Sequence, residues 1–332
     1  MKKKLLVAFL SFISFCCSKE TGTVEKPIVP VIKKIWEESG HNAFTDLIYY
    51  KNAFYCCFRE GSGHIPGTNG KVRVLKSVDG ETWASAAVIE KTGYDLRDPM
   101  ISETPDGRLM IVMGGSVYEN SVLKGLNPHV TFSDNNGANF SEPEKISSAQ
   151  WIWRLTWHKG SGYAVDYPGA YVKLLKTEDG LHYTLIEQLG GRIDGSPNES
   201  TIRFDNNDRM YILTRRESGD QYGMISQADA PYSAWTFNKI KMRVGGPNFL
   251  LYENKMIIGS RLYLKSGGYK TGIVIADLNG NIEKTIELSS GGDTGYPGMV
   301  IRDNKLWVSF YSSSSGKACI YFTTIPIAEL LK

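Results

Sequence analysis

Five arginines of this 332-residue chain stand at the ends of short hydrophobic segments, together with two acids, one histidine and one tyrosine. These residues are Arg59, Arg97, Arg154, Arg215, Arg261, Asp98, Glu199, His41 and Tyr296. Guanidinium groups bind carboxylates through two parallel hydrogen bonds. A single arginine at a strand end usually lies in solvent, but unrelated surface residues have no reason to recur at equivalent positions of a repeat. The pattern therefore indicates a pocket for an anionic, hydroxyl-rich ligand.

The elements that carry these residues are predicted to be β-strands. From residue 41 onward, the apolar runs are four to eight residues long, alternate with polar residues and end at Gly, Asp, Asn or Pro. No long helical stripe interrupts them. The sequence thus predicts an all-β protein.

The strand pairs repeat about every fifty residues. The six opening pairs cover residues 44–58, 99–113, 155–165, 200–214, 249–259 and 297–310. Weaker strand pairs lie between the opening pairs, and one further strand, residues 318–324, follows the last, which predicts a six-bladed β-propeller with four-stranded antiparallel blades. Residues 28–36 are predicted to supply the outer strand of the last blade, so that the N-terminal strand closes the ring and removes its free sheet edges.

A propeller would bring the chemical residues together. Each inner strand begins at one rim of the central channel, and each second strand returns to the same rim. Residues at strand starts, such as Glu199 and Tyr296, would therefore meet residues at strand returns, such as Arg215 and Arg261. We expect a ligand site at this end of the axis.

Three predicted turns between outer strands share a motif. Residues 77–83 read Ser-Val-Asp-Gly-Glu-Thr-Trp, and residues 133–140 and 177–183 vary the same theme. Ser and Asp side chains can satisfy turn amides, Gly permits a positive φ, and the aromatic residue can pack under the turn. The motif resembles the Asp-box of the sialidase superfamily, and these turns are expected to be structural.

A second resemblance to the sialidase (neuraminidase) superfamily lies in the middle of the chain. Residues 197–204 read Pro-Asn-Glu-Ser-Thr-Ile-Arg-Phe, and residues 208–215 read Asp-Arg-Met-Tyr-Ile-Leu-Thr-Arg. They are similar to the sialidase stretch in which a Glu opens a blade and an Arg closes its strand pair. The resemblance implies that Glu199 accepts a proton from a tyrosine nucleophile and that Arg215 binds the carboxylate of the substrate.

Further positions match this family. Arg261 corresponds to another carboxylate-binding arginine, and Tyr296 at the opening of the last blade corresponds to the nucleophile. The step Asp98-Pro99 also recurs in sialidases. A tyrosine nucleophile avoids the repulsion that a carboxylate would feel from an anionic sugar.

The chain also departs from the family pattern. His41-Asn42-Ala43 stands where sialidases carry Arg-Ile-Pro, and His64 is the nearest equivalent of the acid/base Asp. His64 could donate a proton near neutral pH. The predicted catalytic residues are Tyr296, Glu199 and His64, and the predicted substrate-binding residues are Arg215, Arg261, Arg97, Asp98, Arg154, Arg59 and His41.

The resemblance implies an exo-acting glycoside hydrolase that releases a terminal sialic acid or a related acidic sugar from glycans. Two alternatives stay open. The chain could be a glycan-binding propeller without turnover, since it lacks the family's first arginine and acid/base Asp. It could also be a uronate-directed lyase, in which Tyr296 with His41 or His64 abstracts a proton.

The N-terminus predicts export. Residues 1–4 are basic and residues 5–15 are apolar, a length suited to a signal peptide but not to a membrane span. The adjacent cysteines resemble a bacterial lipoprotein signal. We expect residues 1–17 to form this signal with Cys17 as the lipidated residue, residues 18–27 to form a tether, and residues 28–332 to form the propeller. The protein would then be anchored to a membrane in the periplasm or at the cell surface.

Composition excludes other classes of function. The formal net charge is +3, without a run of Lys and Arg long enough to follow a nucleic-acid backbone. The five histidines are dispersed without short ligand spacing, so no metal site is expected, and no cofactor is required. The expected partner is a glycan, bound by a monomer.

Overall fold

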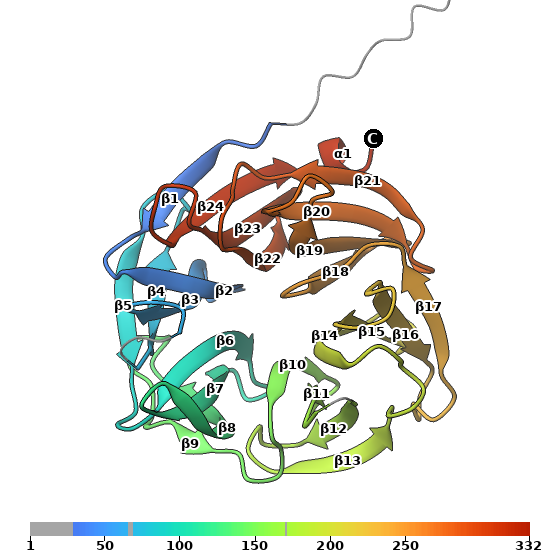
Figure 1. The fold of residues 1–332 in the computed structure, drawn as a ribbon, viewed down its shortest axis with the longest axis horizontal. Coiled ribbons are helices and arrows are strands. Elements are labelled where there is room, and N and C mark those ends of the chain that lie inside the picture. The colour runs from blue at the N-terminus through green and yellow to red at the C-terminus, as the bar shows by residue number, and fades with distance from the viewer. Residues whose placement is uncertain (1–28, 66–68, 170) are drawn as a thin grey trace, which may run out of the picture.

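The computed structural model describes residues 29–65, 69–169 and 171–332. In this part of the chain the strands form six four-stranded antiparallel sheets, which are arranged in a ring (Figure 1). Five of these sheets run outward from the axis in chain order, and the sixth runs β22, β23, β24 and then β1. The predicted six-bladed β-propeller is therefore confirmed.

The strands have the following bounds. The two inner strands of the six blades are β2 (His41–Tyr50) and β3 (Ala53–Gly61), β6 (Asp95–Glu103) and β7 (Leu109–Glu119), β10 (Ile152–His158) and β11 (Ser161–Asp166), β14 (Pro197–Phe204) and β15 (Met210–Arg216), β18 (Asn248–Tyr252) and β19 (Lys255–Tyr263), and β22 (Thr294–Arg302) and β23 (Lys305–Ser312). The outer strands are β4 (Lys71–Ser77) and β5 (Ala84–Ile89), β8 (Val122–Ser133) and β9 (Glu144–Lys145), β12 (Lys173–Thr177) and β13 (Tyr183–Gln188), β16 (Gly223–Ala228) and β17 (Thr236–Ile240), β20 (Tyr269–Asp277) and β21 (Ile282–Glu287), and β24 (Cys319–Pro326) and β1 (Ile32–Trp36).

The ring is closed by the N-terminal strand, as predicted. β1 pairs antiparallel with β24, in the same sheet as β22 and β23. The strand begins at Ile32, later than the predicted start at residue 28, which is outside the described residues. The signal peptide, Cys17 and the tether also lie outside the described residues and stay predictions.

Helix is nearly absent from the described chain. α1 (Ile327–Leu330) is a single turn after the last strand. No helix in the described residues has the length and apolar character needed to cross a membrane.

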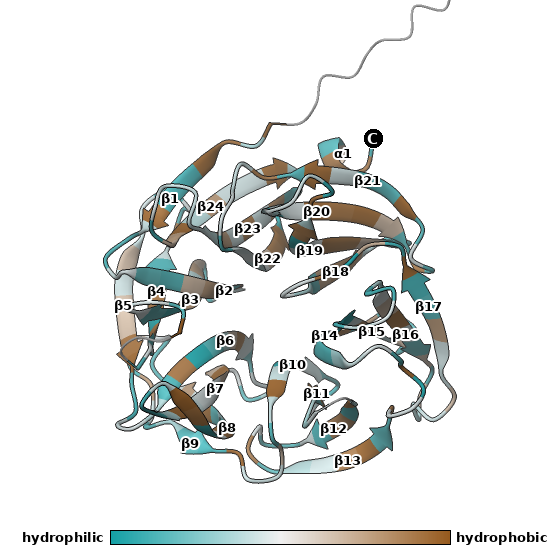
Figure 2. Ribbon diagram, viewed as in Figure 1, coloured by the Kyte–Doolittle hydropathy of each residue, from teal (hydrophilic) through white to brown (hydrophobic). Residues whose placement is uncertain are grey.

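The hydrophobic core lies between neighbouring blades. Cys57 and Val74 of the first blade, for example, share one buried cluster with Ile111 and Met113 of the second. Figure 2 shows the hydrophobic residues distributed along the strands of every sheet. Burial of these faces supplies the main driving force for the ring.

A second set of contacts links the inner strands by hydrogen bonds between blades, and we call it the axial belt. Its bonds run from Thr45 Oγ1 to the Tyr296 carbonyl (2.8 Å), from Asn248 Nδ2 to the Pro297 carbonyl (3.0 Å), from Thr201 Oγ1 to the Pro247 carbonyl (2.7 Å), from Thr156 Oγ1 to the Ile202 carbonyl (2.8 Å), and from Arg154 Nη1 (2.6 Å) and the Ile101 amide (2.9 Å) to Asp46 Oδ2. The belt satisfies polar groups that the ring buries near its axis. It also fixes each inner strand relative to its neighbours.

The inner strands carry bulges close to the rim. The pairing register shifts between Ala43 and Asp46, between Arg97 and Met100, and between Gly295 and Gly298. Within these three bulges Phe44, Asp98 and Tyr296 have φ values of 62°, 50° and 53°. A positive φ is strained for residues with a Cβ, and such strain often accompanies functional sites. A bulge changes the direction in which the side chains of a strand project.

The three predicted turn motifs lie between outer strands. In the first, Asp79 Oδ1 accepts from the amides of Glu81 (2.8 Å) and Thr82 (2.9 Å), and the Gly80 amide donates to Ser77 Oγ (2.9 Å). Asp179 and Thr177 make equivalent bonds in the third motif. Asn135 takes the acid's place in the second. These side chains stabilise turns, and their likeness to an Asp-box remains a resemblance.

Loss of Asp46 tests the belt. Its carboxylate is 1% exposed and pairs with the buried Arg154, so Asp46→Ala leaves a buried guanidinium without its counter-ion. We expect the free energy of unfolding to fall by about 3–5 kcal/mol, measured by urea denaturation. As a control, Glu283→Ala breaks the surface pair with Lys255 and should cost less than about 1 kcal/mol. Equal losses in both variants would contradict a structural role of the belt.

Candidate functional site

The fold brings Tyr296, Glu199 and Arg215 into direct contact. The Tyr296 hydroxyl donates a hydrogen bond of 2.7 Å to Glu199 Oε1. Arg215 Nη1 donates to Glu199 Oε2 at 2.8 Å and to the Tyr296 hydroxyl at 3.3 Å. Tyr296 lies near the start of β22, Glu199 lies near the start of β14, and Arg215 lies near the end of β15. The prediction that strand starts and returns converge is correct for these three residues.

Burial and charge set the protonation of this trio. Glu199 and Tyr296 are only 8% and 9% exposed. Burial, and then the negative charge of Glu199, raise the pKa of Tyr296 well above its usual value, so the resting residue is a phenol. Burial alone would lower the pKa of Arg215, but the adjacent Glu199 carboxylate raises it, and the guanidinium stays charged.

Two further contacts hold the trio in place. The Gly246 amide donates to Glu199 Oε2 at 2.8 Å, next to the bond from Arg215. The Tyr296 ring packs against the buried Trp153 with 5.5 Å between ring centroids. Because the Gly246 Cα also lies against the ring, with a φ of 55°, a Cβ there would meet Tyr296 at 2.4 Å. Only glycine fits this position.

Arg261 lies on the other side of Tyr296. Its guanidinium carbon is 5.3 Å from the centre of the Tyr296 ring. Its donors are held by the Thr294 carbonyl (2.6 Å), Asp293 Oδ1 (2.9 Å) and the Tyr311 hydroxyl (2.8 Å). Tyr311 also donates to Asp293 Oδ1 at 2.7 Å. Arg261 therefore reaches the predicted site, although the protein itself occupies several of its donors.

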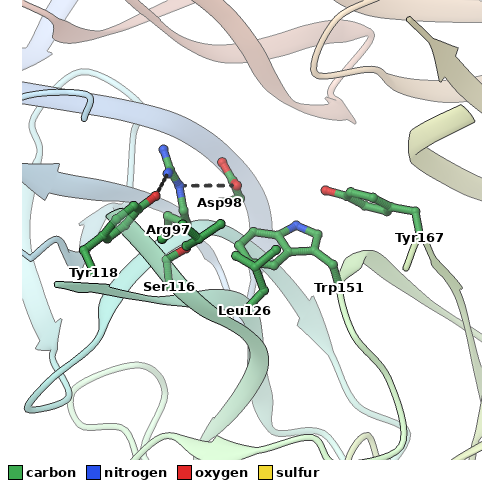
Figure 3. A pocket seen from close by; sticks show the side chains of 8 residues that line it. Arg97, Asp98, Ser116, Tyr118, Leu126, Trp151 and Tyr167 are labelled. Atoms are coloured by element: carbon green, nitrogen blue, oxygen red, sulfur yellow. Dashed lines mark hydrogen bonds and ion pairs between the residues drawn. The ribbon is translucent and has the colours of Figure 1, made fainter. Parts of the chain in front are cut away.

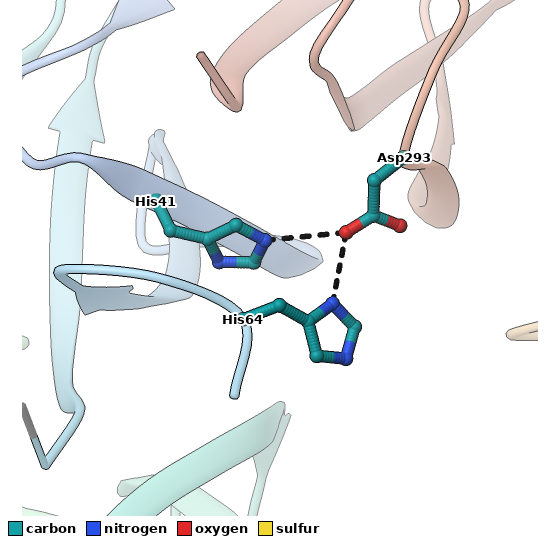
Figure 4. A group of neighbouring side chains, drawn as sticks. All are labelled: His41, His64 and Asp293. Carbon is teal, nitrogen blue, oxygen red and sulfur yellow. Dashed lines mark hydrogen bonds and ion pairs between the residues drawn. The ribbon is translucent and has the colours of Figure 1, made fainter. Parts of the chain in front are cut away.

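His41 and His64 meet at the same carboxylate. His41 Nε2 is 3.2 Å and His64 Nδ1 is 2.9 Å from Asp293 Oδ2 (Figure 4). Burial alone would raise the pKa of Asp293, but its hydrogen bonds from both histidines and from Tyr311 lower it. Phe44 packs against the rings of His64 (5.3 Å) and Tyr296 (5.1 Å), so it links this cluster to the nucleophile candidate.

A pocket of 270 Å³ opens between the second and third blades. It is lined by Arg97, Asp98, Ser116, Tyr118, Leu123, Leu126, Trp151 and Tyr167 (Figure 3). The hairpin of β7 and β8 forms one wall, because β7 continues past the rim to Glu119 rather than ending near Met113 as predicted. The hydroxyl of Tyr167 points toward Asp98 across the pocket (Figure 3). Polar groups at one end and apolar side chains at the other suit a sugar ring.

Asp98 is the acid of this pocket, and its pKa is raised. Burial raises the pKa of its carboxyl to about 6, Arg97 opposes this rise, and the Glu199 carboxylate reinforces it. The nearest Arg97–Asp98 ion-pair contact, from Nε to Oδ2, is 3.8 Å long. Asp98 is thus a carboxylic acid that gains and loses a proton near neutral pH.

Two predicted substrate-binding arginines are buried in ion pairs with acids outside the pocket. Arg59 is 1% exposed and donates from Nε to Asp95 Oδ1 at 2.8 Å. Arg154 is 6% exposed and bonds to Asp46 in the axial belt. Both side chains hold neighbouring blades or loops together. A direct contact with a ligand is not favoured for either.

Asp293 is the main residue that sequence reasoning missed. It lies in the glycine-rich turn before β22, three residues before Tyr296, the position that the sequence analysis considered for this blade. Extending the considered segment by three residues toward the N-terminus would have found it. The expectation of no metal site rested on the dispersed histidines, yet the fold places two of the five next to each other, with 5.2 Å between ring centroids.

Comparisons with known proteins agree with the fold. No protein-family model and no curated protein match the sequence. Among solved structures, a Dyadobacter fermentans protein of unknown function superposes with a TM-score of 0.74 at 18% identity, over 91% of this chain and 99% of that one. A Penicillium chrysogenum α-L-arabinanase complexed with arabinobiose gives 0.68 at 13% identity, over 92% and 99%. Such low identities show a shared fold alone.

A sialidase is also among these structures. Trypanosoma rangeli sialidase, in complex with the inhibitor DANA, gives a TM-score of 0.66 at 12% identity over 95% of this chain. The chain spans 58% of the length of that sialidase. The structural neighbours thus include glycoside hydrolase propellers of more than one specificity.

The raised pKa of Asp98 predicts a pH-dependent gain in stability for Asp98→Asn. In the folded state the pKa is about 6, above the value near 4 of an unfolded chain. The folded protein therefore binds more protons between these values, and Asp98 destabilises it increasingly as pH rises from about 4 to 6. Asparagine removes that charge and tolerates a positive φ. We expect Asp98→Asn to raise the free energy of unfolding by up to about 3 kcal/mol at pH 8 and by little at pH 4, as measured by urea denaturation. A gain of equal size at both pH values would contradict a raised pKa of Asp98 in the folded protein.

Proposed function

We propose that this protein is a retaining exo-glycosidase that removes a terminal acidic sugar from a glycan. The observation that carries the proposal is the 2.7 Å hydrogen bond from the Tyr296 hydroxyl to Glu199, with Arg215 contacting both groups. A nucleophile in contact with its base, and the base held by a third group, is the arrangement expected of covalent catalysis. The glycoside hydrolases among the structural neighbours support this class of reaction.

The first step forms a bond between Tyr296 and the sugar. The Tyr296 oxygen attacks the anomeric carbon while its proton passes to Glu199 Oε1. Arg215 stabilises the negative charge that develops on the phenol oxygen, because its Nη1 lies 3.3 Å away. The bond between the anomeric carbon and the leaving oxygen breaks in the same step.

Asp98 is the proposed proton donor to that leaving oxygen. It is protonated below about pH 6, lines the pocket beside the trio and lies close enough for its charge to affect Tyr296. In the second step the Asp98 carboxylate takes a proton from water, and the water oxygen bonds to the anomeric carbon. The bond between the Tyr296 oxygen and the anomeric carbon breaks, and that oxygen recovers its proton from Glu199. His64, the proton donor predicted from the sequence, bonds to Asp293.

The charge of the pocket supports an acidic sugar. Arg97 and Arg215 flank Asp98 and Glu199, and both guanidinium groups keep a raised pKa. When Asp98 is protonated, one negative charge is removed from this group. The pocket can then accept the carboxylate of a sugar.

Tyr296→Phe tests the nucleophile. We expect release of an aryl reporter from α-sialosides or related acidic glycosides to fall by roughly a thousandfold or more. Binding of a non-hydrolysable analogue, measured by calorimetry, should survive, since the ring and its neighbours remain. Tyr232→Phe is the matched control, because it removes a buried phenol that bonds the Asp208 carbonyl outside the site, and its turnover should be unchanged.

Other outcomes of this experiment distinguish the alternatives. An unsaturated product that absorbs in the ultraviolet would identify a lyase. Absence of turnover in the parent protein, with glycan binding that Arg215→Ala abolishes, would identify a binding module. Full activity of Tyr296→Phe would rule out the proposed mechanism.

Asp98→Asn tests the acid. Parent activity on a sugar leaving group should decline as pH rises through about 6, because Asp98 then loses the proton that it must donate. The variant should lose roughly 10²–10⁴-fold on that substrate but much less on an aryl leaving group that departs without a proton. Comparing kcat/KM for the two substrates from pH 4 to 8 gives the measurement. An equal loss on both substrates would assign Asp98 to binding.

A further inference from the structure

We propose that His41, His64 and Asp293 form a binding site for a divalent metal ion of the zinc class. His41 Nε2, His64 Nδ1 and Asp293 Oδ2 converge at one rim of the propeller (Figure 4), and the three ligand atoms lie within 4.8 Å of one another. Two imidazoles and one carboxylate are a common ligand set of open zinc sites. This site goes beyond the proposed glycosidase activity and does not rest on it.

The distances from the carboxylate oxygen to the two imidazole nitrogens fit such an ion. Zn–N and Zn–O bonds of about 2.0–2.1 Å at angles between 90° and 109° separate neighbouring ligand atoms by about 2.8–3.4 Å. The two measured separations from Asp293 Oδ2 are 2.9 Å to His64 and 3.2 Å to His41. Nitrogen ligands favour zinc and its neighbours over calcium or magnesium, which prefer oxygen.

The Asp293 carboxylate is also held by hydrogen bonds on its second oxygen. Asp293 Oδ1, the oxygen that faces away from the histidines, accepts from Tyr311 at 2.7 Å and from Arg261 at 2.9 Å. Partners of this kind orient the oxygen that binds a metal and are a regular part of metal sites. The carboxylate is thereby fixed with Oδ2 directed at both histidines.

The surroundings also allow an ion and a ligand to enter. The His41 side chain is 9% exposed, which fixes its ring, whereas the His64 side chain is 49% exposed. Three protein ligands leave at least one position open for water or an anionic group. Arg261 bonds to Asp293 and also lies over the Tyr296 ring, so Asp293 is close to the candidate nucleophile. An ion bound to Asp293 would therefore add positive charge near Tyr296.

Zinc binding to the full chain tests the site directly. For this experiment the full chain is prepared with the substitutions Cys16→Ser and Cys17→Ser, so that these two thiols cannot bind zinc. The protein is stripped of metal with a chelator and titrated with Zn²⁺ against a chromophoric competitor. We expect one equivalent per chain, without displacement by Ca²⁺ or Mg²⁺. His64→Ala and Asp293→Asn should each weaken binding by at least about 100-fold, since loss of a group that only orients a ligand already costs roughly 10–100-fold.

The control is His182→Ala. His182 forms an ion pair with Asp179 on the surface, at 2.7 Å, without a third ligand nearby in the described residues. The affinity of the His182→Ala variant for Zn²⁺ should equal that of the parent protein. Cobalt absorption gives a second readout, with visible bands expected for the parent and absent for His64→Ala. Failure to bind one equivalent, or binding that His64→Ala leaves intact, overturns the proposal whether or not the protein is a glycosidase.

Discussion

The axial belt is the constraint on which the rest of the structure depends. Burying the inner strands of six blades around one axis leaves backbone carbonyls and side chains without water, and the belt supplies their partners. Two of its bonds end on the carbonyls of Tyr296 and Pro297. The same interactions that hold neighbouring blades therefore hold the bulge that aims the Tyr296 ring at Glu199. One short segment of β22 therefore both links neighbouring blades and positions the candidate nucleophile.

The site concentrates charge that the fold must balance. Arg215 is paired with Glu199, Arg261 with Asp293, and Arg97 only loosely with Asp98. A close pair lowers the cost of burying both charges, whereas the long contact to Asp98 leaves its carboxyl partly uncompensated. This explains why Asp98 is the acid whose pKa rises. A group that destabilises the folded protein at neutral pH is thus placed where a proton donor is useful.

Sequence periodicity predicted the architecture well, because alternation, turn residues and a fifty-residue repeat all depend on local chemistry. It also placed Glu199, Arg215 and Tyr296 at the same rim. It did not predict side-chain direction beside a bulge, where an extra residue changes the face of the strand. Arg154, which lies within such an irregularity, bonds to Asp46 of the axial belt. The meeting of His41 with His64 depends on a loop conformation that spacing along the chain does not encode.

The pairing of β1 with β24 has a consequence for how the protein folds. The two strands are separated by almost the whole described chain, so the sheet that seals the ring cannot form until its most distant segments meet. Five blades can assemble from consecutive residues, but the sixth requires long-range closure with a large loss of chain entropy. During synthesis, β1 is made first and stays without its partner until β24 has been made. Pairing of the N-terminal strand β1 with β24 therefore closes the row of blades into a rigid ring.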